Sequence, residues 1–176
     1  MKCIWLLTHL LLRFFLVSGS SYVKLEERNN KTRGKFRHFA RQVSGDVFDV
    51  PDNNLMLFSY TSKHMHTFQT GQMCFSLADL SMKSPDIMFD SDYYPQIAFL
   101  FVHRDFQCQG FGSMLMKESL KMIRHHCSER PVRLQSAIDS VEFFEKCGFH
   151  AVAEPFDVIH CGSRLFRTLV NMELDL

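Results

Sequence analysis

Hydrophobic positions in the second half of the chain follow first the pattern of a strand and then that of a helix. The run QIAFLFV (96–102) is continuously apolar, which is typical of a central strand buried on both faces. From Gly110 to His126, apolar residues recur at spacings of three, four and seven, and this predicts an amphipathic helix. Further on, the pattern predicts a short strand at VRLQ (132–135) and a helix at SVEFFEKC (140–147) that ends at Gly148.

The first half of the chain has a weaker pattern. FRHFARQV (36–43) alternates loosely and is a candidate first strand. LMLFSYT (55–61) and QMCFSLADL (72–80) have strand length and could form a hairpin, and KSPDIMFDSDYYP (83–95) is loop-like. The segment from Lys24 to Lys35 is polar and dense in charge, which favours a linker.

The last part of the chain contains two further candidate strands. HAVAEPFDVIH (150–160) and SRLFRTLVNMELDL (163–176) alternate well enough to pair antiparallel through a CGS turn. The element order, strands followed by a core strand, a helix, a strand, a helix and two strands, predicts a mixed α/β domain with helices on a sheet.

Composition limits the chain to one ordinary globular domain. It has 176 residues, of which 46% are hydrophobic and 22% charged, and its formal net charge is +1. This balance gives no reason to expect a nucleic-acid partner. The expected organisation is an N-terminal apolar segment (1–20), a polar linker (21–35) and a folded domain (36–176).

The N-terminal segment has the layout of a secretory signal, because Lys2 precedes an apolar run and small residues follow at 18–20. The run is too short for a membrane span, which needs about 20 apolar residues. No acidic residue precedes Glu26, so a mitochondrial presequence and a simple N-terminal helix are also open.

Cysteine usage favours an intracellular location instead. The chain has six scattered cysteines, and removal of residues up to about Gly19 would leave five. An odd, scattered set is not a disulfide framework, so these thiols are expected to be reduced and buried. The two signals conflict and leave the secretory pathway and the mitochondrion open.

Gly110 and Gly112 lie one residue apart where the predicted helix begins. The first turn of a helix has free N–H groups and the positive end of the dipole, and glycine lets an anion approach the backbone closely. This predicts a phosphate site. The alternative is that the glycines only permit a tight strand-to-helix turn, since the spacing matches neither the P-loop nor the dinucleotide pattern.

The wider context resembles a known family. FLFVHRDFQCQGFGSMLM (99–116) is similar to motif A of the GNAT superfamily of acyl-CoA-dependent N-acetyltransferases, whose pattern Gln/Arg-x-x-Gly-x-Gly/Ala corresponds here to Gln107 to Gly112. SVEFFEKCGF (140–149) resembles the second signature of that family, an aromatic pair followed by Glu-Lys-x-Gly-Phe. Their order and separation also match, and the resemblance covers roughly Phe99 to the end.

The resemblance implies a mixed, mostly antiparallel sheet flanked by helices and splayed between the strand ending at Val102 and the strand near Val132. It implies acetyl-CoA as co-substrate, with the acyl group in the gap and direct attack by an amine of a small molecule or peptide. Main-chain groups of Leu100, Phe101 and Val102 would pair with the pantetheine arm. The pyrophosphate would be bound by the backbone of Gln107, Cys108, Gln109, Gly110, Phe111, Gly112 and Ser113.

Catalytic groups are less clear. Many family members have Tyr as the second aromatic of the second signature, where its hydroxyl protonates the coenzyme A thiolate; this chain has Phe144. A phenyl ring cannot donate that proton, so a weak or inactive coenzyme A-binding or protein-interaction module is the alternative function. Asp90, Asp92 and His103 are candidate general bases.

Two further expectations concern the surroundings of the site. Tyr93 and Tyr94 could line the acceptor cleft, and the first half looks short of the long helices that the family usually has after its first strand. No metal site is expected, because the spacings of Cys108, Cys127 and the neighbouring histidines fit no zinc pattern.

Overall fold

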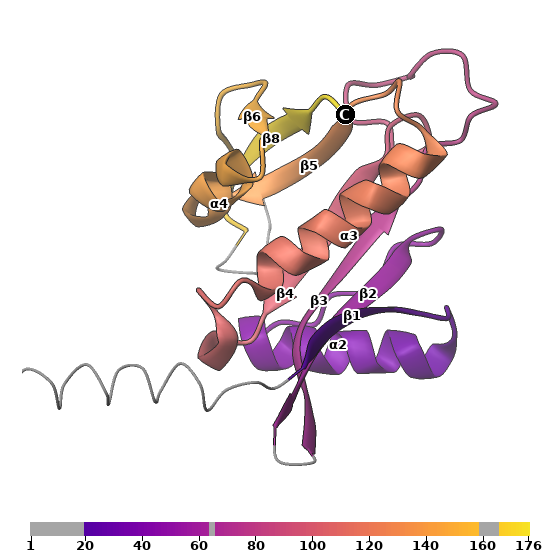
Figure 1. Cartoon of the computed structure of the whole chain (residues 1–176). Helices are drawn as coiled ribbons and strands as arrows, with labels where there is room; N and C mark the ends of the chain where they lie inside the picture. Colours follow the sequence, from indigo (N-terminus) through magenta and orange to yellow (C-terminus); the bar gives the residue numbers. More distant parts are fainter. Residues whose placement is uncertain (1–19, 64–65, 159–165) are drawn as a thin grey trace, which may run out of the picture.

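The computed structural model describes residues 20–63, 66–158 and 166–176. Its elements in chain order are β1 (Ser21–Glu26), α2 (Asn30–Ser44), β2 (Leu55–Lys63), β3 (His66–Ser76), β4 (Gln96–Val102), η1 (Arg104–Phe106), α3 (Phe111–His126), β5 (Val132–Ala137), η2 (Ile138–Ser140), α4 (Val141–Lys146), β6 (His150–Ala151), β7 (Phe156–Asp157) and β8 (Thr168–Leu174) (Figure 1). Within these ranges, no helix combines the length and apolar composition needed to cross a membrane.

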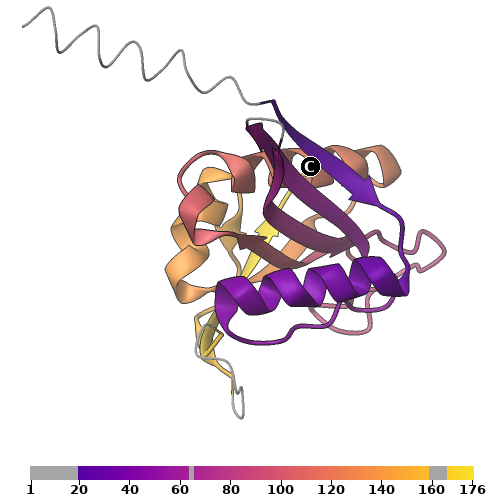
Figure 2. The ribbon, with the colours of Figure 1, turned by 90° about the horizontal axis from the view of Figure 1, so that it is seen from below.

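The strands form one mixed sheet in the order β1-β2-β3-β4-β5-β8-β6, with β7 also paired to β8. Every neighbouring pair is antiparallel except β4 and β5. Helix α2 covers one face of the sheet and α3 the other (Figures 1 and 2). The predicted mixed α/β architecture is therefore confirmed.

Alternation along the strands divides the buried side chains into two cores. Leu57 and Met73 point towards α3 and pack with Leu115, whereas Met56 and Cys74 point towards α2 and pack with Phe36. Each face of the central strands is apolar because each is covered by a helix, which is why β4 shows a continuous apolar run rather than an alternating one.

The linker predicted for 21–35 and the strand predicted for 36–43 are wrong. Residues 21–26 form β1 and pair with β2, and α2 follows, capped by the Asn29 side chain, which accepts the Thr32 N–H at 2.9 Å. Its buried residues are Thr32, Phe36, Phe39 and Ala40, a helical stripe that the surrounding Lys, Arg and His residues obscure in the sequence. The expectation that no long helix follows the first strand is wrong for the same reason.

The C-terminal strands are partly as predicted. β8 forms, but the strand expected at 150–160 is divided into β6 and β7, which are separated by a segment that includes Pro155 and pair separately with β8. The predicted CGS turn (161–163) and residues 1–19 of the N-terminal apolar segment lie outside the described residues.

The sheet opens between β4 and β5, as predicted. Their parallel pairing is limited to Gln96↔Arg133 and Ile97↔Leu134, although β4 continues to Val102 and β5 to Ala137. On the other side of β4, the register with β3 shifts between Cys74 and Phe75, so Ala98 is a bulge residue without an opposite partner. The two strands therefore form a V, whose closed end lies at their first residues (Figure 1).

Candidate functional site

The loop after β4 leads directly into the first turn of α3. Residues Gln107 to Gly110 are exposed, and Gly110, the N-cap residue, adopts a left-handed conformation with φ 86°. The Met114 N–H donates to the Gly110 carbonyl at 2.9 Å, so the amides of residues 111–113 precede the helical hydrogen bonds. The first turn has no acidic residue and no side-chain cap, so the positive end of the helix dipole is free to attract an anion.

Gly110 and Gly112 differ in what a side chain at each position would contact. A Cβ at Gly110 would meet nothing within 4 Å, so the backbone there is open to a ligand. A Cβ at Gly112 would lie 3.1 Å from Cζ of Phe143 and 3.7 Å from Cγ2 of Val102. The absence of a side chain at Gly112 is therefore also required by the packing of the Phe143 ring, and phosphate binding by its backbone amide stays a prediction.

Cys108 is the second left-handed residue of the loop, with φ 58°. This conformation costs a non-glycine residue about 1–2 kcal/mol. The side chains of the loop stabilise it internally: the Gln107 Nε2 donates to the Val102 carbonyl at 3.2 Å and the Gln109 Nε2 to the Asp105 carbonyl at 2.8 Å.

The free edge of β4 faces the gap through alternate residues. The His103 N–H donates to the Thr70 carbonyl of β3 at 2.9 Å, and hydrogen-bonding direction alternates along an antiparallel ladder. The backbone groups of Leu100 and Val102 consequently point away from β3 into the gap. Those of Phe101 point towards β3, and its side chain is buried against α2.

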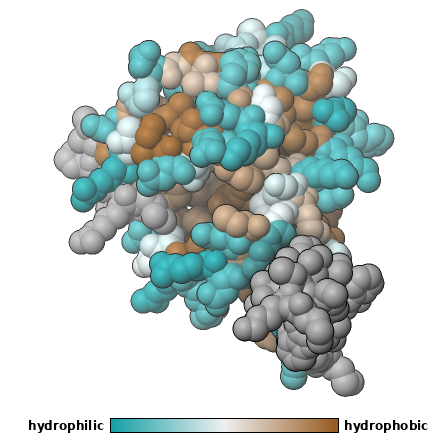
Figure 3. All heavy atoms as spheres, turned by 60° about the vertical axis from the view of Figure 1, so that its left-hand side comes forward, coloured by the Kyte–Doolittle hydropathy of each residue, from teal (hydrophilic) through white to brown (hydrophobic). Residues whose placement is uncertain are grey.

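A cavity of about 580 Å³ lies at the closed end of the V. Ile97, Ala98 and Phe99 of β4 line it on one side and Leu134 and Gln135 of β5 on the other. Further walls come from segments outside these strands and are mostly apolar: Phe48, Pro51, Ile87, Phe89, Val158, Phe166 and Leu169. Figure 3, which brings the open side of the V forward, shows a recess with hydrophobic residues at its depth and hydrophilic residues around it.

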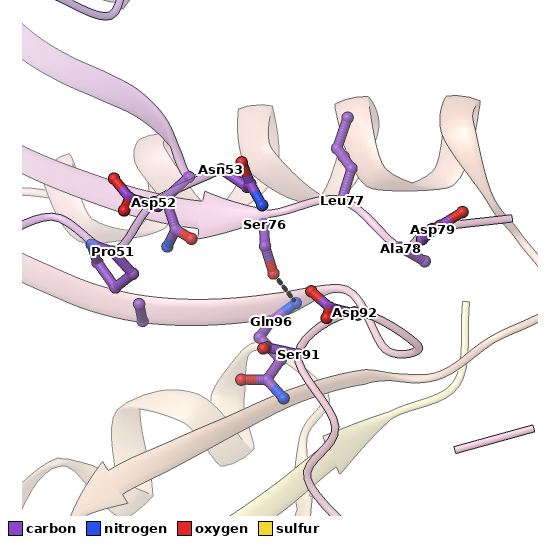
Figure 4. A pocket seen from close by; sticks show the side chains of 12 residues that line it. Pro51, Asp52, Asn53, Ser76, Leu77, Ala78, Asp79, Ser91, Asp92 and Gln96 are labelled. Atoms are coloured by element: carbon purple, nitrogen blue, oxygen red, sulfur yellow. Dashed lines mark hydrogen bonds between the residues drawn. The ribbon is translucent and has the colours of Figure 1, made fainter. Parts of the chain in front are cut away.

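A second cavity of about 500 Å³ adjoins the first and is polar. The two share Pro51, Gln96 and Ala98 as lining residues. In Figure 4, Ser76 points to the start of β4, where its hydroxyl accepts the Gln96 N–H at 3.3 Å. Three carboxylates, those of Asp52, Asp79 and Asp92, also line this cavity.

The candidate bases do not converge on one point. Asp90 and Asp92 precede β4 and His103 follows it, so the length of the strand, about 20 Å, separates them. Asp90 accepts the backbone N–H groups of Asp86, Asp92 and Tyr93, and these bonds, that of Asp86 first, lower the pKa of its carboxyl. These bonds show that Asp90 fixes the loop before β4, and its role as a base stays a prediction.

The two tyrosines before β4 are held by arginines. The guanidinium of Arg130 lies 4.0 Å from the ring centre of Tyr93, and that of Arg133 lies 3.6 Å from Tyr94. Arg130 also donates to the carbonyls of Asp79, Met82 and Tyr93. Neither tyrosine lines the cavity at the V, and these contacts fix the loop before β4; a role in an acceptor cleft stays a prediction.

Phe144 is a core residue, only 8% exposed. Its ring centre lies 5.1 Å from that of Phe143 and 6.0 Å from that of Phe149. It belongs to the same apolar core as Ile97 and Leu134, the last paired residues at the V. Residue 144 therefore packs beside the point where β4 and β5 separate, but as a phenylalanine it has no hydroxyl there.

The cysteines and histidines of the described ranges form no group that could hold a metal ion. Cys74, Cys108, Cys127 and Cys147 are free thiols, as expected, but Cys108 is exposed, which contradicts the expectation of a wholly buried set. Burial raises the pKa of the Cys74 thiol to about 12, so this cysteine is inert. Cys3 and Cys161 lie outside the described residues.

A family model for the acetyltransferase (GNAT) domain matches residues 60–175. The chain belongs to the GNAT acetyltransferase family. No curated protein sequence matches this GNAT chain. Similar solved structures include Arabidopsis thaliana Naa50 in complex with the bisubstrate analogue CoA-Ac-MVNAL, with a TM-score of 0.64 and 15% identity over 88% of this chain and 99% of that one.

Two further structures share the GNAT fold at similarly low identity. The ribosomal-protein-S18-alanine N-acetyltransferase from Escherichia coli has a TM-score of 0.61 and 12% identity, covering 88% of this chain and 93% of its own. The NatC complex bound to Gag peptide and CoA has a TM-score of 0.59 and 14% identity, covering 89% and 99%. These comparisons establish the fold of this GNAT domain.

Sequence reasoning missed the residues that enclose the cavity at the V. Phe48 and Phe89 lie in loops, and Phe166 lies just before β8. Loops carry no periodic pattern, so only the unusual number of phenylalanines, 18 in the chain, hinted at an aromatic cluster beyond the core.

Proposed function

We propose that this protein is an N-acetyltransferase that transfers the acetyl group of acetyl-CoA to a primary amine by direct attack. The proposal rests on one observation: the free edge of β4 leads into a helix mouth with exposed amides, beside a cavity where β4 and β5 part. Membership of the GNAT family supports the same conclusion.

The residues present fit coenzyme A. The backbone of residues 107–111 offers exposed or helix-terminal amides for the pyrophosphate, and Gly110 leaves its surroundings open. The backbone groups of Leu100 and Val102 would pair with the amides of the pantetheine arm. The Gln107 side chain, which now donates to the Val102 carbonyl, would exchange that bond for one to the arm.

The reaction requires two proton movements. The amine nitrogen forms a bond to the thioester carbonyl carbon, and the C–S bond breaks when the tetrahedral intermediate collapses. The nitrogen must lose a proton and the departing thiolate must gain one. No ionisable side chain among the described residues lines the cavity at the V, and Phe144 offers no hydroxyl. We therefore propose water as the carrier of both protons.

Calorimetric titration of acetyl-CoA into three proteins tests the proposal. Gly110→Asp places a carboxylate at the proposed phosphate site, and Gly45→Asp is the matched control, since Gly45 also has a positive φ and nothing within 4 Å. Both variants carry the same backbone cost. We expect binding about tenfold weaker or more in Gly110→Asp and nearly unchanged in Gly45→Asp. Absence of heat in the wild type, or equal loss in both variants, refutes the coenzyme site.

A second candidate function is a module that binds coenzyme A without efficient turnover. Phe144 favours it, because general acid catalysis is typically worth about 10²–10⁴ in rate. Release of free thiol from acetyl-CoA in the presence of an amine panel separates the two functions. Binding without release that Phe144→Tyr does not restore would support the module.

A further inference from the structure

The cavity at the closed end of the V begins where β4 and β5 separate. Ile97 and Leu134 form the last registered pair of the two strands, and both line the cavity. Its volume of about 580 Å³ lies within the range of small-molecule sites. A group bound here would therefore lie beside the first free backbone groups of β4, next to the proposed place of the thioester.

The chemistry of this cavity is apolar. Its described lining contains no Asp, Glu, Lys, Arg or His, and its only polar side chains are the amides of Gln96 and Gln135. A second ammonium group on the acceptor would find no counter-ion here, and burying an unpaired charge is strongly unfavourable.

Aromatic rings form one wall of the cavity. The ring centre of Phe48 lies 5.2 Å from that of Phe99 and 5.1 Å from that of Phe166, the latter at an interplanar angle of 88°. These three residues come from a loop, from β4 and from the segment before β8. An aromatic wall of this kind offers a large apolar surface against which another aromatic group can pack.

The adjoining polar cavity offers little to a second cation. Asp52 already forms ion pairs with Arg28 at 2.7 Å and Arg33 at 3.4 Å. Asp79 accepts the Ser81 N–H at 2.8 Å. The third carboxylate, that of Asp92, lines the polar cavity but not the apolar one.

From these observations we infer that the acceptor is a primary amine with a bulky apolar group next to the amine, and that diamines and polyamines are poor substrates. This inference rests on the proposed function and narrows its acceptor class. The same chemistry occurs in a free arylalkylamine and at the N-terminus of a peptide whose first residue is large and apolar, so the test includes both.

The test compares phenethylamine, the peptide Phe-Ala-Ala-amide, cadaverine and spermidine. Their kcat/KM values are measured with acetyl-CoA, and their binding to the protein saturated with coenzyme A is measured by calorimetry. For at least one of the two apolar amines, we expect kcat/KM to exceed the values for both cadaverine and spermidine by about 10- to 200-fold. This is the range of discrimination that an apolar pocket provides. The better of the two apolar amines identifies the source.

Ile87→Glu tests the cavity directly. Ile87 lines it and is 66% exposed, so a charge there leaves the core intact. We expect the preference for phenethylamine over cadaverine to fall about fivefold, as an exposed ion pair allows. The matched control is Met88→Glu, which adds the same charge at the next residue. Met88 is 51% exposed and does not line the cavity. We expect this control to change the preference for phenethylamine over cadaverine less than about twofold.

The outcomes separate the inference from the proposed function. Better binding or turnover of cadaverine or spermidine overturns the inference while leaving the acetyltransferase in place, as does an equal effect of the two glutamate variants. Binding of acetyl-CoA without binding of either apolar amine to the coenzyme A complex also overturns it. Failure to bind acetyl-CoA at all refutes the proposed function itself.

Discussion

Replacing Gly112 by alanine tests whether the glycine is required by the ring of Phe143. The new methyl would lie 3.1 and 3.2 Å from two carbons of that ring, so the ring must move by a few tenths of an ångström. Phe143 is itself packed against Phe144 at 5.1 Å, which opposes the movement. Overpacking of this kind costs about 1–3 kcal/mol, whereas the gain in helix propensity is at most about 1 kcal/mol.

Gly34→Ala is the matched control. Gly34 also lies within a helix, α2, but a Cβ there would meet nothing within 4 Å. We expect Gly34→Ala to raise the free energy of unfolding by about 1 kcal/mol and Gly112→Ala to lower it by about 1 kcal/mol. In urea, with a slope of about 1–3 kcal/mol per molar, the two midpoints should differ by about 1 M.

Two further measurements decide the cause. Phe143→Leu should remove most of the penalty, so that Gly112→Ala becomes neutral or stabilising in that background. Acetyl-CoA affinity should change little in Gly112→Ala, since the added methyl points to Phe143 and not into the loop. A Gly112→Ala protein that is as stabilised as Gly34→Ala, or one that loses acetyl-CoA binding, contradicts the packing argument.

Three other predictions follow from the site. Phe144→Tyr should raise kcat about tenfold or more and lower the free energy of unfolding by about 1–2 kcal/mol. Phe149→Tyr is the control, because Phe149 is also buried, and it should destabilise the protein without raising kcat. Steady-state kinetics and thermal melts measure the two effects. No ionisable group lines the cavity in the described ranges, so the acceptor must arrive as a neutral amine. For an alkylamine of pKa about 10, kcat/KM should therefore rise about tenfold per pH unit from about pH 6.5 to 8.5. A plateau of kcat/KM near pH 7 would instead reveal a base. Asp90→Asn should leave kcat nearly unchanged and destabilise the protein at pH 7. Because backbone N–H groups lower the pKa of the Asp90 carboxyl in the folded state, the stability difference in urea melts should begin to shrink only below about pH 4, the pKa of a free Asp, and should keep shrinking as the pH falls through the lowered folded-state pKa. A stability difference that stays constant from pH 7 to about pH 2 would contradict it.

The second half of the chain could be predicted from sequence because its elements have clear periods. β4 is an uninterrupted apolar run and α3 keeps a helical spacing over 16 residues, so each could be assigned without tertiary information. The splayed strands were predictable only from the family resemblance. Strand separation depends on which backbone groups lack a partner, and side-chain pattern does not report that.

The first half was misread because its helix is amphipathic with a narrow apolar stripe. Only Thr32, Phe36, Phe39 and Ala40 of the 15 residues of α2 are buried. The charged residues around this stripe include Arg33 and Arg37, both of which pair with Asp49 at the surface. A capping signal was present, since Asn29 precedes the stripe and its side chain accepts the Thr32 N–H, but Asn29 lies within a run of charges that favours a linker.

The bulge at Ala98 explains how β4 contributes side chains to both cores and still lines a cavity. Without the bulge, Phe99 would share the face of Ile97 and point towards α3. The bulge instead places Ala98 and Phe99 on the α2 side, while Ile97 and Leu100 pack on the α3 side.

The small side chain of Ala98 lines both cavities, so the space between Phe99 and Leu134 depends on its size. A leucine there would keep the apolar pattern of β4 and the fold but would fill the junction between the two cavities. The volume at the junction of the two cavities therefore depends on one small bulged residue, whose role the hydrophobic pattern of the strand cannot show.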